Sequence, residues 1–315
     1  MEKKEHVLVT GGAGYVGSTL VPRLLQAGYR VTVLDNLTYG GDGLLPCFQV
    51  EDFTFIKGDV RDKATVEKAI HGVDAVIHLA GIVGYPACKR DPELAKQVNE
   101  DSTKHISDIL PKDKVLIFAS TGSNYGSVTD GVCTEETPLN PLTVYGVTKT
   151  NAERHINATR KNAIIFRFAT AFGISPRMRL DLLINDFTYR VMRENYLLIY
   201  EKEFKRTFID VRDMAKAFLF ALKHRDKMAG QTYNVGSNGM NYSKEDVAGM
   251  LKTYRPNYFL HFADAGKDED QRNYEVKYDK INALGFTTDI DIKRGLDDLT
   301  QVMSILNFKN PYSNV

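Results

Sequence analysis

The sequence predicts an α/β fold, a Rossmann-like, doubly wound parallel sheet followed by a smaller carboxy-terminal lobe. Short apolar strands alternate with helical patterns, a glycine-rich turn follows the first strand, and the alternation loosens after residue 168 of 315. Strands that are apolar throughout belong to parallel sheets covered by helices on both faces. The chain also exceeds the usual size of a one-core domain, which favours a companion lobe.

Six strands are predicted in the first half of the chain, each a short run rich in β-branched or aromatic residues. They cover residues 6–10, 30–35, 53–59, 75–81, 114–120 and 163–168. Helical patterns lie between most of them. Two examples are residues 18–29 and 63–72, and a glycine closes the second, as a helix C-cap favours.

The second half predicts fewer regular elements. Residues 177–200 read as a helix followed by a strand, 207–224 as strand, turn and helix, and 231–237 as a short strand. Ser243 is the predicted cap of a helix over 243–254. We therefore expect a first domain at 1–168 with returning segments near 207–236, interleaved with a smaller lobe at 169–315.

Composition excludes several classes of protein. A net charge of +1 with 26% charged and 43% hydrophobic residues argues against a disordered chain and against a nucleic-acid partner. Cys47, Cys88 and Cys133 lack metal-binding spacing, so we expect reduced thiols and no metal. The chain has no apolar run of the roughly 18 residues that a membrane span needs. These features predict a cytoplasmic protein without a membrane partner.

A dinucleotide site is predicted after the first strand. Gly11, Gly14 and Gly17 stand between this strand and a helix, where a diphosphate can approach the backbone and the helix N-terminus. Asp35 ends the second strand, suits the ribose hydroxyls and would repel a 2′-phosphate. Neither Asn36 nor the residue after it is an arginine, so NAD is favoured over NADP. Asp59 suits either the adenine edge or a helix N-cap, and the sequence leaves both interpretations open.

Tyr145 and Lys149 form a candidate catalytic pair. Their i, i+4 spacing places both side chains on one face of a helix. A nearby ammonium favours the phenolate, which lowers the tyrosine pKa and suits a general base acting on a hydroxyl. The alternative is an exposed pair on an amphipathic helix. The pair follows a Ser/Thr-rich strand end by about 20 residues, downstream of the nucleotide motif, which favours the catalytic interpretation.

Several motifs occur together in a fixed order. They are TGGAGYVGS at 10–18, the acid at 35, GDVRD at 58–62, HLAG at 78–81, the Ser/Thr strand end, YGVTK at 145–149 and RTFIDVRD at 206–213. Together they resemble the extended short-chain dehydrogenase/reductase family of nucleotide-sugar epimerases and dehydratases. The resemblance runs from about residue 6 to 278. Within this family, residues 172–190 look most similar to a bacterial group that includes GDP-heptose 4-dehydrogenases.

The resemblance implies roles for individual residues. Tyr145 matches the catalytic base, Lys149 its partner on the nicotinamide ribose, and Thr121 the hydroxyl that contacts the reacting group. The implied cofactor-binding residues are Gly11, Gly14, Tyr15, Val16, Gly17, Asp35, Asn36, Asp59, Val60, Leu79, Ala80, Gly81, Asn99, Ser120, Tyr145, Lys149 and Phe168.

The lobe at 169–315 is expected to help bind a nucleotide-diphosphate sugar. The implied substrate-binding residues are Val83, Thr121, Ser123, Arg177, Arg179, Asn185, Arg206 and Arg272. Arginine suits diphosphates because its planar donors are bidentate. For Arg177 and Arg179 the alternative is a solvated helix start, and for Arg272 it is a solvated surface loop. The helices that begin near Asp91 and Val144 have apolar stripes. In the family such stripes form a homodimer interface, but they could also pack on the sheet.

The predicted reaction is oxidation at C4 of the sugar. The family's 4,6-dehydratases place Asp-Glu directly after the threonine, whereas this chain has Gly122 and Ser123. Neither transfers a proton as a carboxyl group does, so dehydration is disfavoured. We expect a 4-dehydrogenase or 4-epimerase in polysaccharide biosynthesis, favouring a GDP-heptose-like substrate, with a UDP-hexose 4-epimerase as the alternative. A non-catalytic NAD-binding regulator is the alternative of another class.

Overall fold

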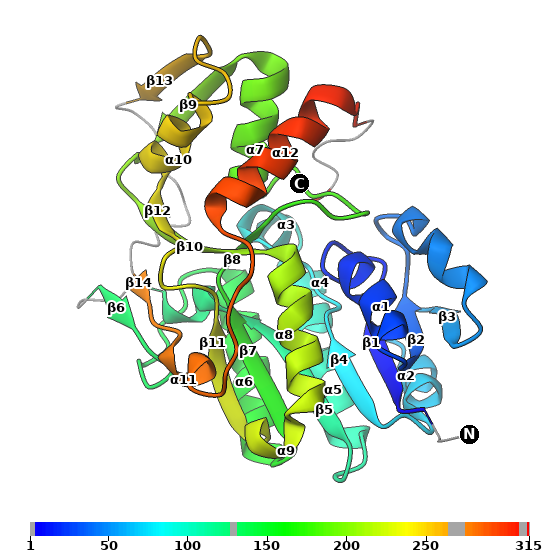
Figure 1. The fold of residues 1–315 in the computed structure, drawn as a ribbon. Helices are drawn as coiled ribbons and strands as arrows, with labels where there is room; N and C mark the ends of the chain where they lie inside the picture. The colour runs from blue at the N-terminus through cyan, green and yellow to red at the C-terminus, as the bar shows by residue number, and fades with distance from the viewer. Residues whose placement is uncertain (1–3, 127–130, 264–274, 309–313, 315) are drawn as a thin grey trace.

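The computed structural model describes residues 4–126, 131–263, 275–308 and 314. Its centre is a seven-stranded parallel sheet in the order β11-β7-β5-β4-β1-β2-β3 (Figure 1). These strands are β1 (His6–Thr10), β2 (Arg30–Asp35), β3 (Phe53–Lys57), β4 (Ala75–His78), β5 (Val115–Thr121), β7 (Ala163–Phe168) and β11 (Gln231–Val235). The order reverses between β1 and β4, the point where such sheets bind ligands. The predicted doubly wound α/β fold is confirmed.

Helices cover both faces of this sheet. Helices α1 (Gly17–Gln26) and α8 (Val211–Lys223) share one hydrophobic core with one face, whereas α2 (Lys63–Ile70), α5 (Ser102–Ile109) and α6 (Val144–Thr159) share a second core with the other. Strands β1, β4 and β7 are buried at every position because helices pack on both sides. This burial explains why these strands read as continuous apolar runs.

A second group of elements lies beyond one end of the sheet (Figure 1). Its core joins α7 (Leu183–Tyr189), α10 (Lys244–Leu251) and α12 (Ile292–Ile305) to short strands. The strands are β8 (Thr170–Phe172), β9 (Tyr196–Tyr200), β10 (Lys205–Asp210), β12 (Asn241–Ser243) and β13 (Phe259–Ala263). Strand β10 pairs with β8 and β12, so α8 and β11, but not β10, return to the main sheet.

The remaining elements are short connections. They are η1 (Asp42–Gln49), α3 (Tyr85–Arg90), α4 (Pro92–Lys96), η2 (Gln97–Asp101), η3 (Gly122–Tyr125), β6 (Val132–Cys133), η4 (Arg190–Glu194), α9 (Arg225–Met228), β14 (Glu275–Val276) and α11 (Asp279–Asn282). No helix in the part of the chain that the structure describes is long and apolar enough to cross a membrane. The same residues contain no group of three side chains suited to a metal ion.

Local signals predicted some boundaries well and others poorly. Ser243 caps α10 through a capping box with Asp246, with hydrogen bonds of 3.0 and 2.9 Å. The helix expected from residue 177 begins only at Leu183, because the backbone before it is irregular. Cys88 is fully buried in α3, where its thiol donates to the carbonyl of Ile82.

Candidate active site

A cleft of about 390 Å³ opens at the carboxyl ends of the central strands. Its first part, here the glycine end, is lined by Gly11, Gly14 and Asp35. Its second part, the tyrosine end, is lined by Thr121, Ser123 and Tyr145. Small-molecule sites in Rossmann sheets occupy this location, next to the switch point of the strand order. The cleft is therefore the candidate active site.

The glycine end requires residues without side chains. Gly11 has φ of +69°, and a Cβ there would lie 2.6 Å from the backbone nitrogen of Ala80. A Cβ on Gly17 would lie 2.5 Å from Cα of Gly12. Only glycine allows both the left-handed turn and the close approach of α1 to the loop. The positive end of α1 consequently faces the cleft without covering side chains.

Two aspartates border the glycine end. The oxygens of Asp35 accept the backbone N–H groups of Ala13 at 3.0 Å and Leu37 at 2.8 Å, and burial raises the Asp35 pKa. Asp59 accepts hydrogen bonds from the Arg61 guanidinium and backbone, which lower its pKa to about 2. The N-cap of α2 is Asp62, so Asp59 does not have the helix-cap role that the sequence left open. Asp59 lines the cleft, which favours its other interpretation, a contact to the ligand.

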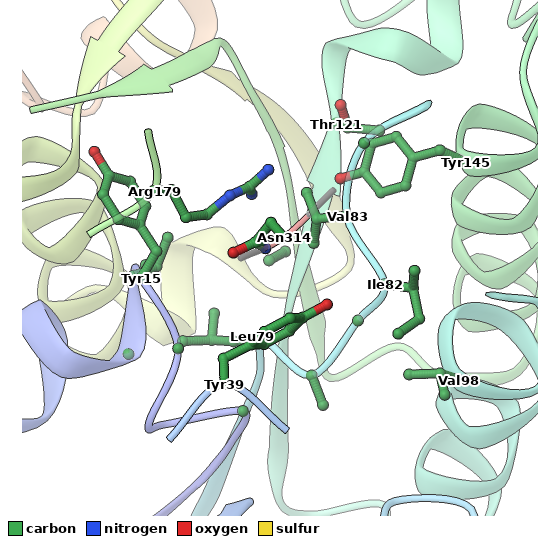
Figure 2. Close-up of a pocket in the computed structure, with 18 of the residues that line it drawn as sticks. Tyr15, Tyr39, Leu79, Ile82, Val83, Val98, Thr121, Tyr145, Arg179 and Asn314 are labelled. Atoms are coloured by element: carbon green, nitrogen blue, oxygen red, sulfur yellow. The ribbon is translucent and has the colours of Figure 1, made fainter. Parts of the chain in front are cut away.

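The tyrosine end brings two hydroxyl groups together. Thr121 is the last residue of β5, and its Oγ1 accepts the backbone N–H of Ser123 and donates to the Ser123 hydroxyl, both at 3.1 Å. Tyr145 stands in the first turn of α6, which is capped by Thr143. Figure 2 shows the side chains of Thr121 and Tyr145 at the same end of the cleft. Both line it, so both hydroxyls are candidate contacts for a hydroxyl-bearing ligand.

Lys149 lies one turn after Tyr145 and is buried beneath the cleft. Its ammonium lies 4.0 Å from the centre of the Phe118 ring. Burial lowers the pKa of Lys149 to about 7, although Cys88 and Glu153 oppose the shift. The pair is therefore not an exposed one on an amphipathic helix. In the ligand-free protein, the buried ammonium is costly to keep charged.

This cost predicts a pH-dependent stability. The unfolded Lys149 has its ordinary pKa of 10.5, so between about pH 7 and 10 the unfolded chain binds more protons than the folded one. The free energy of unfolding then rises with pH, by up to about 1.4 kcal/mol per pH unit from this residue. Below pH 7 both states are protonated and the penalty is complete. Lys149→Met should therefore raise the melting temperature most below pH 7, and progressively less towards pH 10.

Thermal unfolding followed by circular dichroism from pH 6 to 10, without ligand, measures this difference. Lys161→Met, which removes an exposed lysine just beyond α6, is the control and should differ from wild type by the same small amount at every pH. A difference for Lys149→Met that does not change with pH would contradict the assigned burial cost.

The two predicted arginines of residues 177–179 are buried, with exposed fractions of 9% and 8%, rather than solvated. Arg179 pairs with Asp181 at 2.5 Å; burial lowers the Arg179 pKa, but Asp181, with a smaller contribution from Tyr145, raises it above its ordinary value. Arg177 instead lies with its guanidinium 4.4 Å from the centre of the Tyr39 ring. Both arginines line the cleft.

Most of the remaining predicted residues also line this cleft. They are Tyr15, Val16, Gly17, Asn36, Val60, Leu79, Ala80, Gly81, Val83, Ser120 and Phe168. Tyr15 presents its ring to the cleft while its hydroxyl donates to the carbonyl of Gly173 at 2.7 Å. The Ser120 hydroxyl donates to Glu153 at 2.9 Å beneath the cleft floor.

Two predicted contact residues lie behind the wall of the cleft instead. Asn99 is fully buried, and its amide accepts from the nitrogen and donates to the carbonyl of Ile82, at 2.8 and 2.9 Å. Asn185 is fully buried too, accepts from Gly173 and donates to the carbonyl of Arg179, both at 2.9 Å. Each amide is occupied by backbone groups of a cleft loop, so both side chains hold the loop in place, and their ligand contacts stay predictions.

The other two predicted arginines do not belong to the described cleft. Arg206 is buried on β10 and lines a small adjoining cavity together with Gly122 and Thr170. Phe168 and Thr170 line both cavities, so Arg206 lies beside the cleft rather than in it. Arg272 lies outside the described residues.

Sequence reasoning missed several residues of the cleft. They include Tyr39, Arg61, Tyr85, Thr143, Leu182 and Asn314. Asn314 is only 7% exposed, and within the described part of the chain its Oδ1 has no hydrogen-bond partner. Figure 2 shows it between the two ends of the cleft. No periodicity or motif marks this residue, whereas Tyr39 could have been suspected because it closely follows β2.

Comparison with known proteins agrees with this geometry. The model of the NAD dependent epimerase/dehydratase family matches residues 7–236. A putative UDP-glucose 4-epimerase of Methanocaldococcus jannaschii is 28% identical over 303 residues, covering 92% of this chain and 95% of that protein. A dTDP-glucose 4,6-dehydratase of Streptomyces niveus is 28% identical over 306 residues, covering 92% and 90% respectively.

Among solved structures, MoeE5 in complex with UDP-glucuronic acid and NAD has a TM-score of 0.82 and is 26% identical, covering 94% of this chain and 98% of that one. The glycine end fits NAD, since Gly11 and Gly17 leave the helix terminus open and Asp35 stands at the end of β2. The chain therefore belongs to the NAD dependent epimerase/dehydratase family of enzymes and uses NAD as its cofactor.

Proposed function

We propose that this enzyme oxidises the C4 hydroxyl of a nucleotide-linked sugar and then restores it with inverted configuration, as a UDP-sugar 4-epimerase. The observation that carries the proposal is the composition of the tyrosine end. Thr121 and Tyr145 both line this end, and the carboxylates among the described lining residues, Asp35 and Asp59, border the glycine end.

Each residue of the tyrosine end has a distinct task. Tyr145 removes the proton of the sugar C4 hydroxyl and later returns it. Thr121 holds that hydroxyl by a hydrogen bond, and the protonated Lys149 favours the phenolate form of Tyr145. When bound, NAD accepts hydride from the sugar carbon and supplies it again. Only the reversal of these steps on the other face of the sugar is needed for 4-epimerisation.

Dehydration at C5 and C6 needs an additional acid and base close to the sugar. Gly122 and Ser123 follow Thr121, and neither carries a carboxyl group. Glu153, the nearest acid in α6, is buried below the floor and bound to Arg167. The described residues thus support a redox-neutral inversion better than an elimination, although the family includes both.

The choice of sugar nucleotide is drawn from the relatives, whereas the chemistry is drawn from the residues of the cleft. The relatives named above carry UDP- and dTDP-sugars in their descriptions, so UDP is supported at least as well as the GDP-heptose predicted from residues 172–190. A GDP-heptose remains the second candidate, because the buried Arg179–Asp181 pair offers donors and acceptors for extra sugar hydroxyls. Arg206 is the proposed contact for the nucleotide diphosphate.

Incubation of the purified enzyme with UDP-, dTDP-, GDP- and ADP-linked sugars, including a GDP-heptose, tests the proposal. We expect proton NMR to show a C4 epimer of a UDP-sugar, without a lasting rise in absorbance at 340 nm. A lasting rise would identify a dehydrogenase and refute the return of the hydride. A product lacking the C6 hydroxyl would refute the argument against dehydration, and inactivity with every sugar would refute the proposal as a whole.

The predicted homodimer stays a prediction. On α6, Val147 is among the large hydrophobic side chains that remain exposed in the described chain, and Leu142 just before the helix is another. Because α6 is one of the helices predicted to form the dimer, sedimentation of the purified protein with and without NAD would test the association directly.

A further inference from the structure

The segment that follows β8 is fastened to the glycine loop. The Ser175 hydroxyl donates to the carbonyl of Tyr15 at 2.6 Å, and the hydroxyls of Ser175 and Ser18 lie 2.9 Å apart. The backbone N–H of Arg177 donates to the Ser18 hydroxyl at 3.3 Å. Together with the Tyr15 bond to Gly173, these contacts are buried, so residues 173–177 have a fixed position over the first turn of α1.

This attachment places the Arg177 guanidinium at the glycine end. The guanidinium stacks over Tyr39, and the Asp35 and Arg177 charges influence each other's pKa: Arg177 lowers that of Asp35, and Asp35 raises that of Arg177. Burial is nevertheless the main influence and lowers the Arg177 pKa. Arg179, two residues later, pairs with Asp181 and interacts electrostatically with Tyr145. Arg177 thus has Asp35 as its acidic neighbour in the cleft, whereas the carboxylate bound to Arg179 is Asp181.

We infer that Arg177 and Tyr39 form a clamp over the diphosphate of NAD, so that Arg177 is a cofactor-binding rather than a substrate-binding residue. The glycine loop and the N-terminus of α1 supply backbone donors on one side of a diphosphate. Arg177 supplies a planar cation with parallel donors on the other side, in a buried position where such contacts are strong. Tyr39 keeps the guanidinium in place by a cation–π contact.

The clamp has a consequence for cofactor exchange. NAD bound beneath Arg177 can leave only after the guanidinium moves off Tyr39, while the hydrogen bonds to Tyr15 and Ser18 keep the backbone of residues 173–177 in place. Release of the cofactor is therefore expected to be slow. If the proposed 4-epimerisation is correct, slow release keeps the cofactor in place between the two halves of the reaction, which an inversion needs and a dehydrogenase does not.

Binding measurements on the intact enzyme test the clamp independently of turnover. After removal of bound cofactor, calorimetry should show that Arg177→Met weakens NAD binding by about tenfold or more, the size expected for losing one charge-assisted contact. Arg177→Lys, which keeps the charge but loses the planar donors, should fall between this variant and wild type. Stopped-flow displacement should show faster NAD release in both.

Two further variants complete the design. Arg179→Lys makes the same chemical change as Arg177→Lys, but in the arginine that pairs with Asp181. It retains a cation beside Asp181 and should leave NAD affinity within about twofold of wild type. Tyr39→Leu removes the stacking ring without altering Arg177 and should weaken NAD binding several-fold, even if Arg177→Met fails to fold. UDP affinity should be unchanged in the Arg177 variants. Unchanged NAD affinity together with weakened UDP binding in Arg177→Met would overturn the assignment.

Discussion

Replacing Tyr145 with phenylalanine is expected to lower turnover by roughly two to four orders of magnitude, the usual range for loss of a general base. The substitution removes one oxygen from the tyrosine end and keeps the ring that lines the cleft. NAD affinity should change little, since the contacts predicted for the diphosphate and adenosine lie at the glycine end. Steady-state kinetics on the active sugar nucleotide, with calorimetric NAD binding measured in parallel, checks both statements.

A matched control is available in the smaller lobe. Tyr254→Phe also removes a tyrosine hydroxyl, one that donates to Asp297 at 2.7 Å away from the cleft, and should leave turnover near that of wild type. Thr121→Val should weaken turnover less than Tyr145→Phe, because it removes a hydrogen bond rather than the base. Turnover near that of wild type in Tyr145→Phe would exclude Tyr145 as the base and would require another group at this end.

The parts of this molecule that were predictable from sequence are local. Strands β1, β4 and β7 are buried on both faces, so their residues form continuous apolar runs. The glycine loop is recognisable because a strand, a glycine-rich turn and the start of a helix follow one another within a dozen residues. Tyr145 and Lys149 are found by their helical spacing together with their position about 20 residues beyond the Ser/Thr-rich strand end. In each case the residues that determine the structure are close together in the chain.

The parts that were not predictable depend on contacts between distant segments. Asn185 and Asn99 were predicted among the ligand-binding residues, and their amides bind the backbone of Gly173 and Ile82, 12 and 17 residues away in the chain. The stacking of Arg177 on Tyr39 joins segments that no periodicity connects. Residues 174–181 form no described helix or strand. No helical or strand periodicity therefore indicated which part of the cleft Arg177 and Arg179 would contact.

Breaking the buried pair of Arg167 and Glu153 should destabilise the protein by about 3–5 kcal/mol, because one charge is left without its partner in the interior. Arg167 on β7 donates to Glu153 on α6 through Nε at 3.0 Å and through Nη2, and the exposed fractions of the two side chains are 6% and 1%. Arg167→Met leaves the Glu153 carboxylate without its cationic partner, and Glu153→Gln leaves the Arg167 guanidinium without its anionic partner. Urea unfolding measured by circular dichroism gives the change.

The double variant Arg167→Met/Glu153→Gln distinguishes lost pairing from lost packing. If the single variants suffer mainly from a stranded charge, the double variant should lose less free energy of unfolding than the sum of the two. Lys293→Met, which breaks the exposed pair with Asp297, is the matched control and should change the free energy of unfolding far less than either buried variant. Additive losses in the double variant would show that packing, rather than charge compensation, dominates at this position.

The same pair links stability to the chemistry of the cleft. Glu153 also accepts from the Ser120 hydroxyl at 2.9 Å and from the Asn124 amide at 3.0 Å, on either side of Thr121. Glu153→Gln should therefore lower turnover under conditions where the protein remains folded, because the end of β5 loses two anchors that orient Thr121. A folded Glu153→Gln variant with wild-type turnover would mean that Thr121 is positioned by β5 and its own bonds to Ser123 alone.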